Sequence, residues 1–172
     1  MVNISDINFK FLFPYKFKII GLFLVVPGII LTIIRFYYGI KPTIFNVKVF
    51  AFYSKYLETK YFSIISNHIS EEIAGILILV GLIFVVFSKE KIESDLIMKI
   101  RYESLIISIL INSCLVILSY LFAFGLAFVG VLILNIYSFF IIYIIVFQLY
   151  IFKYRIKLNE QRNNQYGYNN KT

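Results

Sequence analysis

The chain has 172 residues, of which 60% are hydrophobic and 15% are charged, and its mean hydropathy is +0.85. Soluble domains hold about 45–50% apolar and about 25% charged residues. The composition therefore disfavours a soluble domain, a disordered chain, a collagen and a disulfide scaffold, and it predicts an integral membrane protein. The net charge of +8 comes from cations that flank apolar runs. We expect these cations to meet the headgroups of the lipid bilayer, with no nucleic-acid partner.

The first apolar run covers residues 19–34 and has one basic residue at each end. Long basic side chains can reach toward the headgroups, so we expect a first transmembrane helix at 17–37, after a cytoplasmic segment at 1–16. Pro27 and Gly28, near its centre, should kink this helix. A secretory signal peptide is the alternative. It is disfavoured because no small-residue cleavage site follows the run.

An aromatic-rich loop follows at residues 38–70. Residues 45–54 alternate with period two and are rich in strand formers, and residues 61–65 can supply a returning strand. We therefore expect a short extracytoplasmic β-hairpin with its turn within 55–59. Three roles stay open for it: an aromatic belt resting on the interface, a ligand-sensing cap, and an edge that docks a partner.

The second span is expected at residues 71–88. It is short, and its start is marked by Ser70 as a helix cap, followed by Glu71 and Glu72 at the positive end of the helix dipole.

The third apolar stretch, residues 104–152, contains no Asp, Glu, Lys or Arg. It is more than twice as long as one span, so the chain must turn back within it. Gly125 and Gly130 bracket the expected turn at 125–130, which leaves spans at 105–124 and 131–152. The fold class is thus an all-α membrane protein with four transmembrane helices. A basic and then disordered cytoplasmic tail is expected at 153–172.

The cations set the expected orientation. With both termini on one side, that side holds twelve Lys and Arg and the other side holds five. We therefore expect the amino and carboxyl termini in the cytoplasm.

The segment at 89–104 joins the second and third spans on the cytoplasmic side. Its acidic and basic residues have helical spacing, and its apolar residues recur on one side. We expect an amphipathic helix with a break near 90–94, although a simple charged corner is the alternative. A possible partner surface is formed by Leu96, Ile97 and Ile100.

The run FSKEKIESDLIMKIRYESL at 87–105, after a short span opened by ISEE at 69–72, resembles a group of small uncharacterised bacterial four-span inner-membrane proteins. The resemblance covers roughly residues 53–152. It implies a multi-pass protein of the bacterial inner membrane and implies no activity.

Residues that would carry catalysis or bind metal are sparse. The single histidine, His68, has only Glu71 and Glu72 nearby, whereas zinc sites need three or four ligands. We therefore predict no metal site, no catalytic residues and no cofactor. The interior of the four spans carries no ionisable residue, which disfavours a proton-coupled carrier.

Amides and hydroxyls inside the third and fourth spans are expected to link those helices by hydrogen bonds. Asn112 should pair with Asn135 if the chain reverses at Gly125, and with Ser138 if the reversal is centred between the two glycines.

These observations favour a non-enzymatic membrane protein that acts through contacts, as an accessory, regulatory or scaffold component of a membrane assembly. Its partner would be another protein or a second copy of the chain. An oligomeric pore or small-molecule transporter subunit is the first alternative, and a membrane-active toxin or immunity-type protein is the second.

Overall fold

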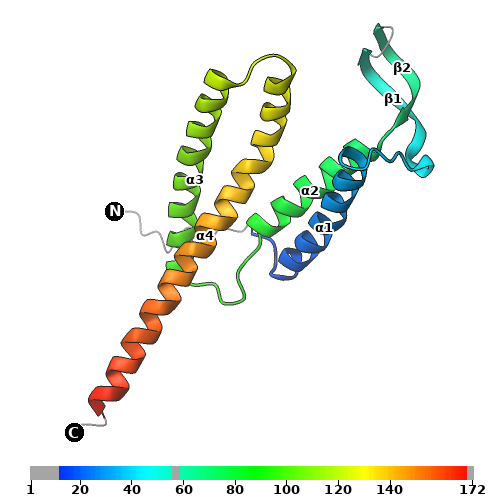
Figure 1. Ribbon diagram of the computed structural model, residues 1–172. Helices are drawn as coiled ribbons and strands as arrows, with labels where there is room; N and C mark the ends of the chain where they lie inside the picture. Colours follow the sequence, from blue (N-terminus) through cyan, green and yellow to red (C-terminus); the bar gives the residue numbers. More distant parts are fainter. Residues whose placement is uncertain (1–11, 56–58, 170–172) are drawn as a thin grey trace. The chain divides into compact units, whose positions relative to one another are not determined.

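The computed structural model describes residues 12–55 and 59–169 (Figure 1). The chain is mostly helical with one small sheet, and it forms two compact units, Ile19–Gly81 and Leu82–Thr172 with Met1–Lys18. Its elements are α1 (Lys16–Phe36), the 3-10 turn η2 (Thr43–Phe45), β1 (Asn46–Lys55), β2 (Thr59–His68), α2 (Ser70–Val86), α3 (Asp95–Phe122) and α4 (Leu126–Asn169).

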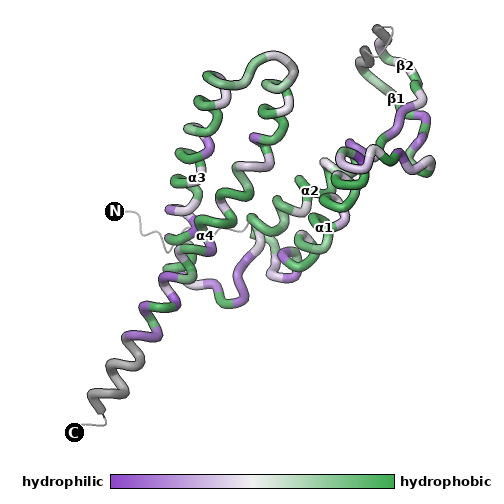
Figure 2. Tube along the Cα trace, in the orientation of Figure 1, coloured by the Kyte–Doolittle hydropathy of each residue, from purple (hydrophilic) through white to green (hydrophobic). Residues whose placement is uncertain are grey.

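Within the described residues, three helical segments are long and apolar enough to cross a membrane: Lys16–Phe36, Asp95–Phe122 and Ala127–Glu160. Their hydrophobic character is visible along most of α1, α3 and the first part of α4 (Figure 2). Their length and composition agree with the predicted membrane protein. The remaining helix, α2, has 17 residues, which is about 25 Å of helix and somewhat less than the ~30 Å of a hydrocarbon core.

Within the unit Ile19–Gly81, α1 and α2 pack antiparallel through glycines. A Cβ on Gly28 would lie 2.7 Å from Ile78 Cγ1, and one on Gly81 would lie 2.7 Å from the carbonyl oxygen of Gly21. Because these glycines have no side chain, the two backbones approach closely. The helix α1 is unbroken through Pro27.

The ends of α1 and α2 near the sheet are held by an ion pair. Arg35 donates to Glu71 Oε1 from Nε at 2.7 Å, and a terminal guanidinium nitrogen lies 2.5 Å from the same oxygen. Ser70 does not act as the predicted cap, since the first helical bond runs from the Ile73 amide to the Ile69 carbonyl. The Ser70 hydroxyl is buried beside His68 Nδ1 instead, at 2.9 Å.

The predicted β-hairpin is confirmed as an antiparallel pair, with Asn46 opposite His68 and Lys55 opposite Thr59. The second strand is longer than expected and continues to His68. Most of the predicted turn, residues 56–58, lies outside the described residues. The rings of Phe50, Phe52 and Phe62 form an exposed cluster on one face, with centroids 5.3–6.4 Å apart.

Within the second unit, α3 and α4 form a helical hairpin whose turn is earlier and tighter than predicted. The helix α3 ends at Phe122 and α4 begins at Leu126, so the reversal occupies Ala123–Gly125. Gly125 adopts a φ of 66°, a left-handed conformation that glycine reaches without strain. Gly130 lies inside α4, so the reversal occurs at the Gly125 end of the expected turn at 125–130, and the rest of that range is helical.

The expected break near 90–94 is present, because residues 89–94 are not helical and α3 begins at Asp95, where the Ser94 side chain accepts a bond from the Ile97 amide. The helix predicted within 89–104 therefore covers only the later part of that segment and continues into the third span. The expected disordered tail is helical as far as Asn169. Helix formers such as Lys, Arg, Leu and Gln continue past the apolar run without Gly or Pro until Gly167, so the helix propagates.

The core of this unit lies away from the Ala123–Gly125 turn, where the end of α2 and the start of α3 meet α4. Its buried members are Val86, Tyr143, Phe147 and Ile151. Partly buried side chains pack around them: Ile97, Ile100, Leu105, Phe140 and Ile144.

Candidate functional site

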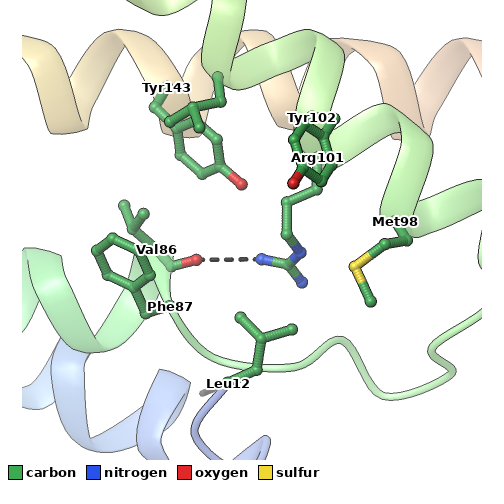
Figure 3. Close-up of a pocket in the computed structure, with 8 residues that line it drawn as sticks. Leu12, Val86, Phe87, Met98, Arg101, Tyr102 and Tyr143 are labelled. Atoms are coloured by element: carbon green, nitrogen blue, oxygen red, sulfur yellow. Dashed lines mark hydrogen bonds between the residues drawn. The ribbon is translucent and has the colours of Figure 1, made fainter. Parts of the chain in front are cut away.

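A cavity of about 340 Å³ lies beside this core (Figure 3). Its walls come from the segment before α1, the end of α2, the first turns of α3 and the middle of α4. Seven lining side chains are apolar or aromatic and one, Arg101, is charged. The full lining is Leu12, Val86, Phe87, Met98, Arg101, Tyr102, Leu105 and Tyr143.

The segment before α1 is fixed against the end of α2 by backbone hydrogen bonds. The amide of Phe13 donates to the Phe87 carbonyl, and the amide of Lys89 donates to the Phe13 carbonyl, both at 2.9 Å. The rings of Phe13, Phe17 and Phe84 pack together with centroids 5.1–5.4 Å apart. Leu12 is thereby positioned as one wall of the cavity.

Arg101 is the main polar group of the cavity, and only 12% of its side chain is exposed. It donates to the carbonyls of Val86 at 3.1 Å and Ser88 at 3.2 Å. Both carbonyls lie where α2 ends, and carbonyls at the end of a helix have no acceptor role within that helix. The guanidinium carbon also lies 4.9 Å from the centroid of the Phe147 ring, within cation–π range. Arg101 thus joins α3 to α2 and α4.

The carboxylates of Glu93 and Glu90 fix the 89–94 segment. Glu93 Oε1 lies 3.5 Å from the guanidinium, and Glu93 Oε2 accepts the Glu90 amide at 2.7 Å. Glu90 pairs with Lys18 at 2.5 Å. The segment is therefore an ordered loop held by two ion pairs, and Glu93 is the only ion-pair partner of Arg101 within the described part of the chain.

In the sequence, Arg101 counted only as one of the twelve expected cytoplasmic cations, although a pattern that indicates its burial is present. Polar residues recur along α3 every three or four positions, at Arg101, Ser104, Ser108 and Asn112, which places them on one helical face. Ser104 and Ser108 are fully buried, so this face points into the protein. A cation in the same stripe should therefore be buried as well.

The predicted partner surface is divided by the structure. Leu96 is 49% exposed, but Ile97 and Ile100 pack against the core of the unit. The helix α3 starts only at Asp95 and its apolar side turns inward, so Ile97 and Ile100 are not free to form that surface.

Further along the same stripe, the structure brings together the three predicted helix-linking residues. Asn112 Nδ2 donates to Asn135 Oδ1 at 3.3 Å, and Asn135 Nδ2 donates to Asn112 Oδ1 at 3.5 Å. The Ser138 hydroxyl donates to Asn112 Oδ1 at 2.7 Å. The predicted contact between Asn112 and Asn135 is therefore confirmed, together with the reversal at Gly125 on which it depended. The contact with Ser138, which was expected only for a later reversal, is present as well.

Beyond this triad, α3 and α4 separate toward their turn (Figure 1). The space between them is an open groove of about 450 Å³ with mostly apolar walls. Asn135 and Ser138 belong to its lining, together with Leu115, Leu118, Ser119, Phe122, Ala123, Val131 and Leu134.

His68, in the other unit, has a structural environment. Its Nε2 donates to the Pro42 carbonyl at 2.9 Å, and its Nδ1 faces the Ser70 hydroxyl. The neighbouring carboxylates are engaged elsewhere, Glu71 with Arg35 and Glu72 with Asn67. Among the residues that the structure describes, no three His, Cys, Asp or Glu side chains gather as a metal site would require.

No family model, curated protein or solved structure matches this chain.

Proposed function

We propose that this chain is a four-span protein of the bacterial cytoplasmic membrane, with both termini in the cytoplasm. It acts through contacts, as an accessory, regulatory or scaffold component of a membrane assembly, and not as an enzyme. The observation that carries this proposal is the open groove between α3 and α4, which has apolar walls and an amide–hydroxyl triad beside it.

The packing of α2 supports the fourth crossing. Its close antiparallel contact with α1 extends from Gly28 and Ile78 to Gly21 and Gly81. If α1 crosses the bilayer, α2 lies in the same hydrocarbon layer. A slightly short helix is accommodated by local thinning of the bilayer, and the Arg35–Glu71 pair then lies at the headgroup level.

Reporter fusions test this topology directly. An alkaline phosphatase fusion at Thr59 is expected to be active, and one at Thr172 inactive, with a cytoplasmic reporter giving the opposite pattern. If α2 stays on one side of the membrane, only three spans remain and the termini lie on opposite sides. Active phosphatase at Thr172 would therefore reject either the fourth span or the orientation.

The groove supports a contact role because helix pairs in membranes associate through close packing and interhelical hydrogen bonds. A transmembrane helix seated between Leu118 and Leu134 would cover the apolar walls and could present a polar group to Ser138 or Asn135. That helix belongs either to a partner protein or to a second copy of this chain.

Photocrosslinking in intact membranes tests the groove. A benzoylphenylalanine at Leu118, which lines the groove, is expected to give one discrete protein adduct. The matched control is the same residue at Ile117, which is also exposed but does not line the groove, and which should react only with lipid. An adduct of twice the chain mass identifies a second copy. Equal labelling at both positions would reject the groove as an interface, and ion flux through reconstituted protein would favour the oligomeric pore.

A further inference from the structure

We propose that the cavity at Arg101 binds an acidic lipid from the bilayer, with the anionic head group on the guanidinium and one acyl chain along the apolar walls. This inference is independent of the partner helix proposed above, because the cavity and the groove are separate and have no lining residue in common.

The chemistry of the walls selects an amphiphile. Val86, Phe87 and Leu105, with the other apolar side chains, supply a surface that suits hydrocarbon, while Arg101 supplies a single fixed cation. Ligand pockets have volumes of roughly 300–1,000 Å³, so about 340 Å³ is at the lower end and suits one acyl chain. A purely apolar ligand would leave the charged group of Arg101 without an added partner.

The hydrogen bonding of Arg101 leaves capacity for an anion. Its Nε is buried and has no acceptor among the described residues. The Glu93 oxygen at 3.5 Å is a long contact, and Glu90 is occupied by Lys18. Buried donors without a partner are costly, and an arginine fork binds carboxylate or phosphate oxygens through paired N–H groups. A phosphate or carboxylate oxygen would satisfy the free Nε.

The position of the cavity matches a lipid source. Arg101 lies near the start of α3, where the polar 89–94 segment ends and the apolar span begins. Phosphate groups of a bilayer lie at this border, and basic pockets between transmembrane helices on the cytoplasmic side bind acidic head groups. Figure 3 shows the guanidinium among Val86, Met98 and Leu12, and the Tyr143 hydroxyl directed toward Arg101.

Thermal unfolding of the full chain in lipid nanodiscs tests the proposal. Replacing phosphatidylcholine by a mixture with phosphatidylglycerol is expected to raise the Tm by about 5–10 °C at saturation. Arg101→Gln should abolish the increase. Lys99→Gln, which removes an exposed cation two residues away, should retain it and so controls for general surface charge.

A second variant keeps the test decisive if Arg101→Gln does not fold. Met98→Trp fills the cavity without changing charge, and should leave the Tm in phosphatidylcholine near that of the wild type while removing the phosphatidylglycerol effect. An increase that survives in Met98→Trp would overturn the proposal. So would an equal increase from inorganic phosphate in phosphatidylcholine discs, because that result would show an anion site with no role for the acyl chain.

Discussion

Gly81→Ala is expected to lower the Tm of the purified protein by roughly 3–10 °C, which corresponds to about 1–3 kcal/mol of overpacking. A methyl group at this position would lie 2.7 Å from the Gly21 carbonyl oxygen and 3.0 Å from the Val25 amide nitrogen. Both atoms belong to the backbone of α1, so no side-chain rotation can relieve the clash. The two helices must separate, and the contacts along their whole crossing weaken.

Gly130→Ala is the matched control for this experiment. Gly130 also lies inside a helix of the membrane part, but a Cβ there would meet nothing within 4 Å. Glycine in a helix interior costs about 1 kcal/mol relative to alanine, so this variant should be unchanged or slightly more stable. Thermostability is measured as the fraction of protein that stays monodisperse after heating. Equal losses for the two variants would show that the α1–α2 crossing is not close-packed.

The length of apolar runs predicted much of the architecture. The charge-free stretch 104–152 exceeds one bilayer thickness, so physical length alone required a helical hairpin there, and the structure has one in α3 and α4. The period-two pattern at residues 45–54 predicted the strand β1 for an equally direct reason, because alternate side chains of a strand point to opposite faces. Both predictions depend only on the geometry of a helix or a strand, namely the length of a membrane-spanning helix and the alternation of side chains along a strand.

The exact turn could not be predicted in the same way. Gly125 and Gly130 are both glycines in an apolar context, and either can adopt a left-handed φ. The reversal at Gly125 accompanies a hairpin in which Asn112 reaches Asn135 and Ser138 together. Such contacts depend on two helices together, so they cannot be predicted from the residues of either helix alone.

The close crossing of α1 and α2 was missed because its glycines were interpreted one helix at a time. Pro27 and Gly28 predicted a kink, but Gly28 serves the contact with α2. Gly21 and Gly28 are seven residues apart, and so are Ala74 and Gly81. This shared spacing of small residues is the signal of a helix pair, and it appears only when the two segments are compared.

The environment of Arg101 was also missed, because it depends on how several helices pack. Arg101 and Lys99 counted equally as cytoplasmic cations in the prediction of the orientation, whereas the structure gives them different environments. Lys99 is exposed, whereas Arg101 is mostly buried and contacts carbonyls at the end of α2 and the ring of Phe147. Only the position of Arg101 within the buried stripe of α3 separates the two, and that stripe had been identified solely by its apolar members.

Replacing Ile100 by aspartate is expected to lower the Tm by roughly 5–12 °C, because it puts a carboxylate against the core of Val86, Tyr143, Phe147 and Ile151. A charge placed in such surroundings without a partner costs several kcal/mol, part of which is relieved by movement toward water. Arg101 is the adjacent residue, but its guanidinium is directed to the carbonyls of Val86 and Ser88. It is therefore not available to neutralise the new carboxylate.

Leu96→Asp provides the contrast, since this side chain is 49% exposed and lies one turn earlier on α3. Aspartate in the first turn of a helix also interacts favourably with the helix dipole, so the Tm should change by less than about 2 °C. Scanning both variants in the same detergent makes the comparison. A large loss at Leu96 with none at Ile100 would mean that the apolar side of α3 faces outward, toward a partner, as the sequence alone had suggested.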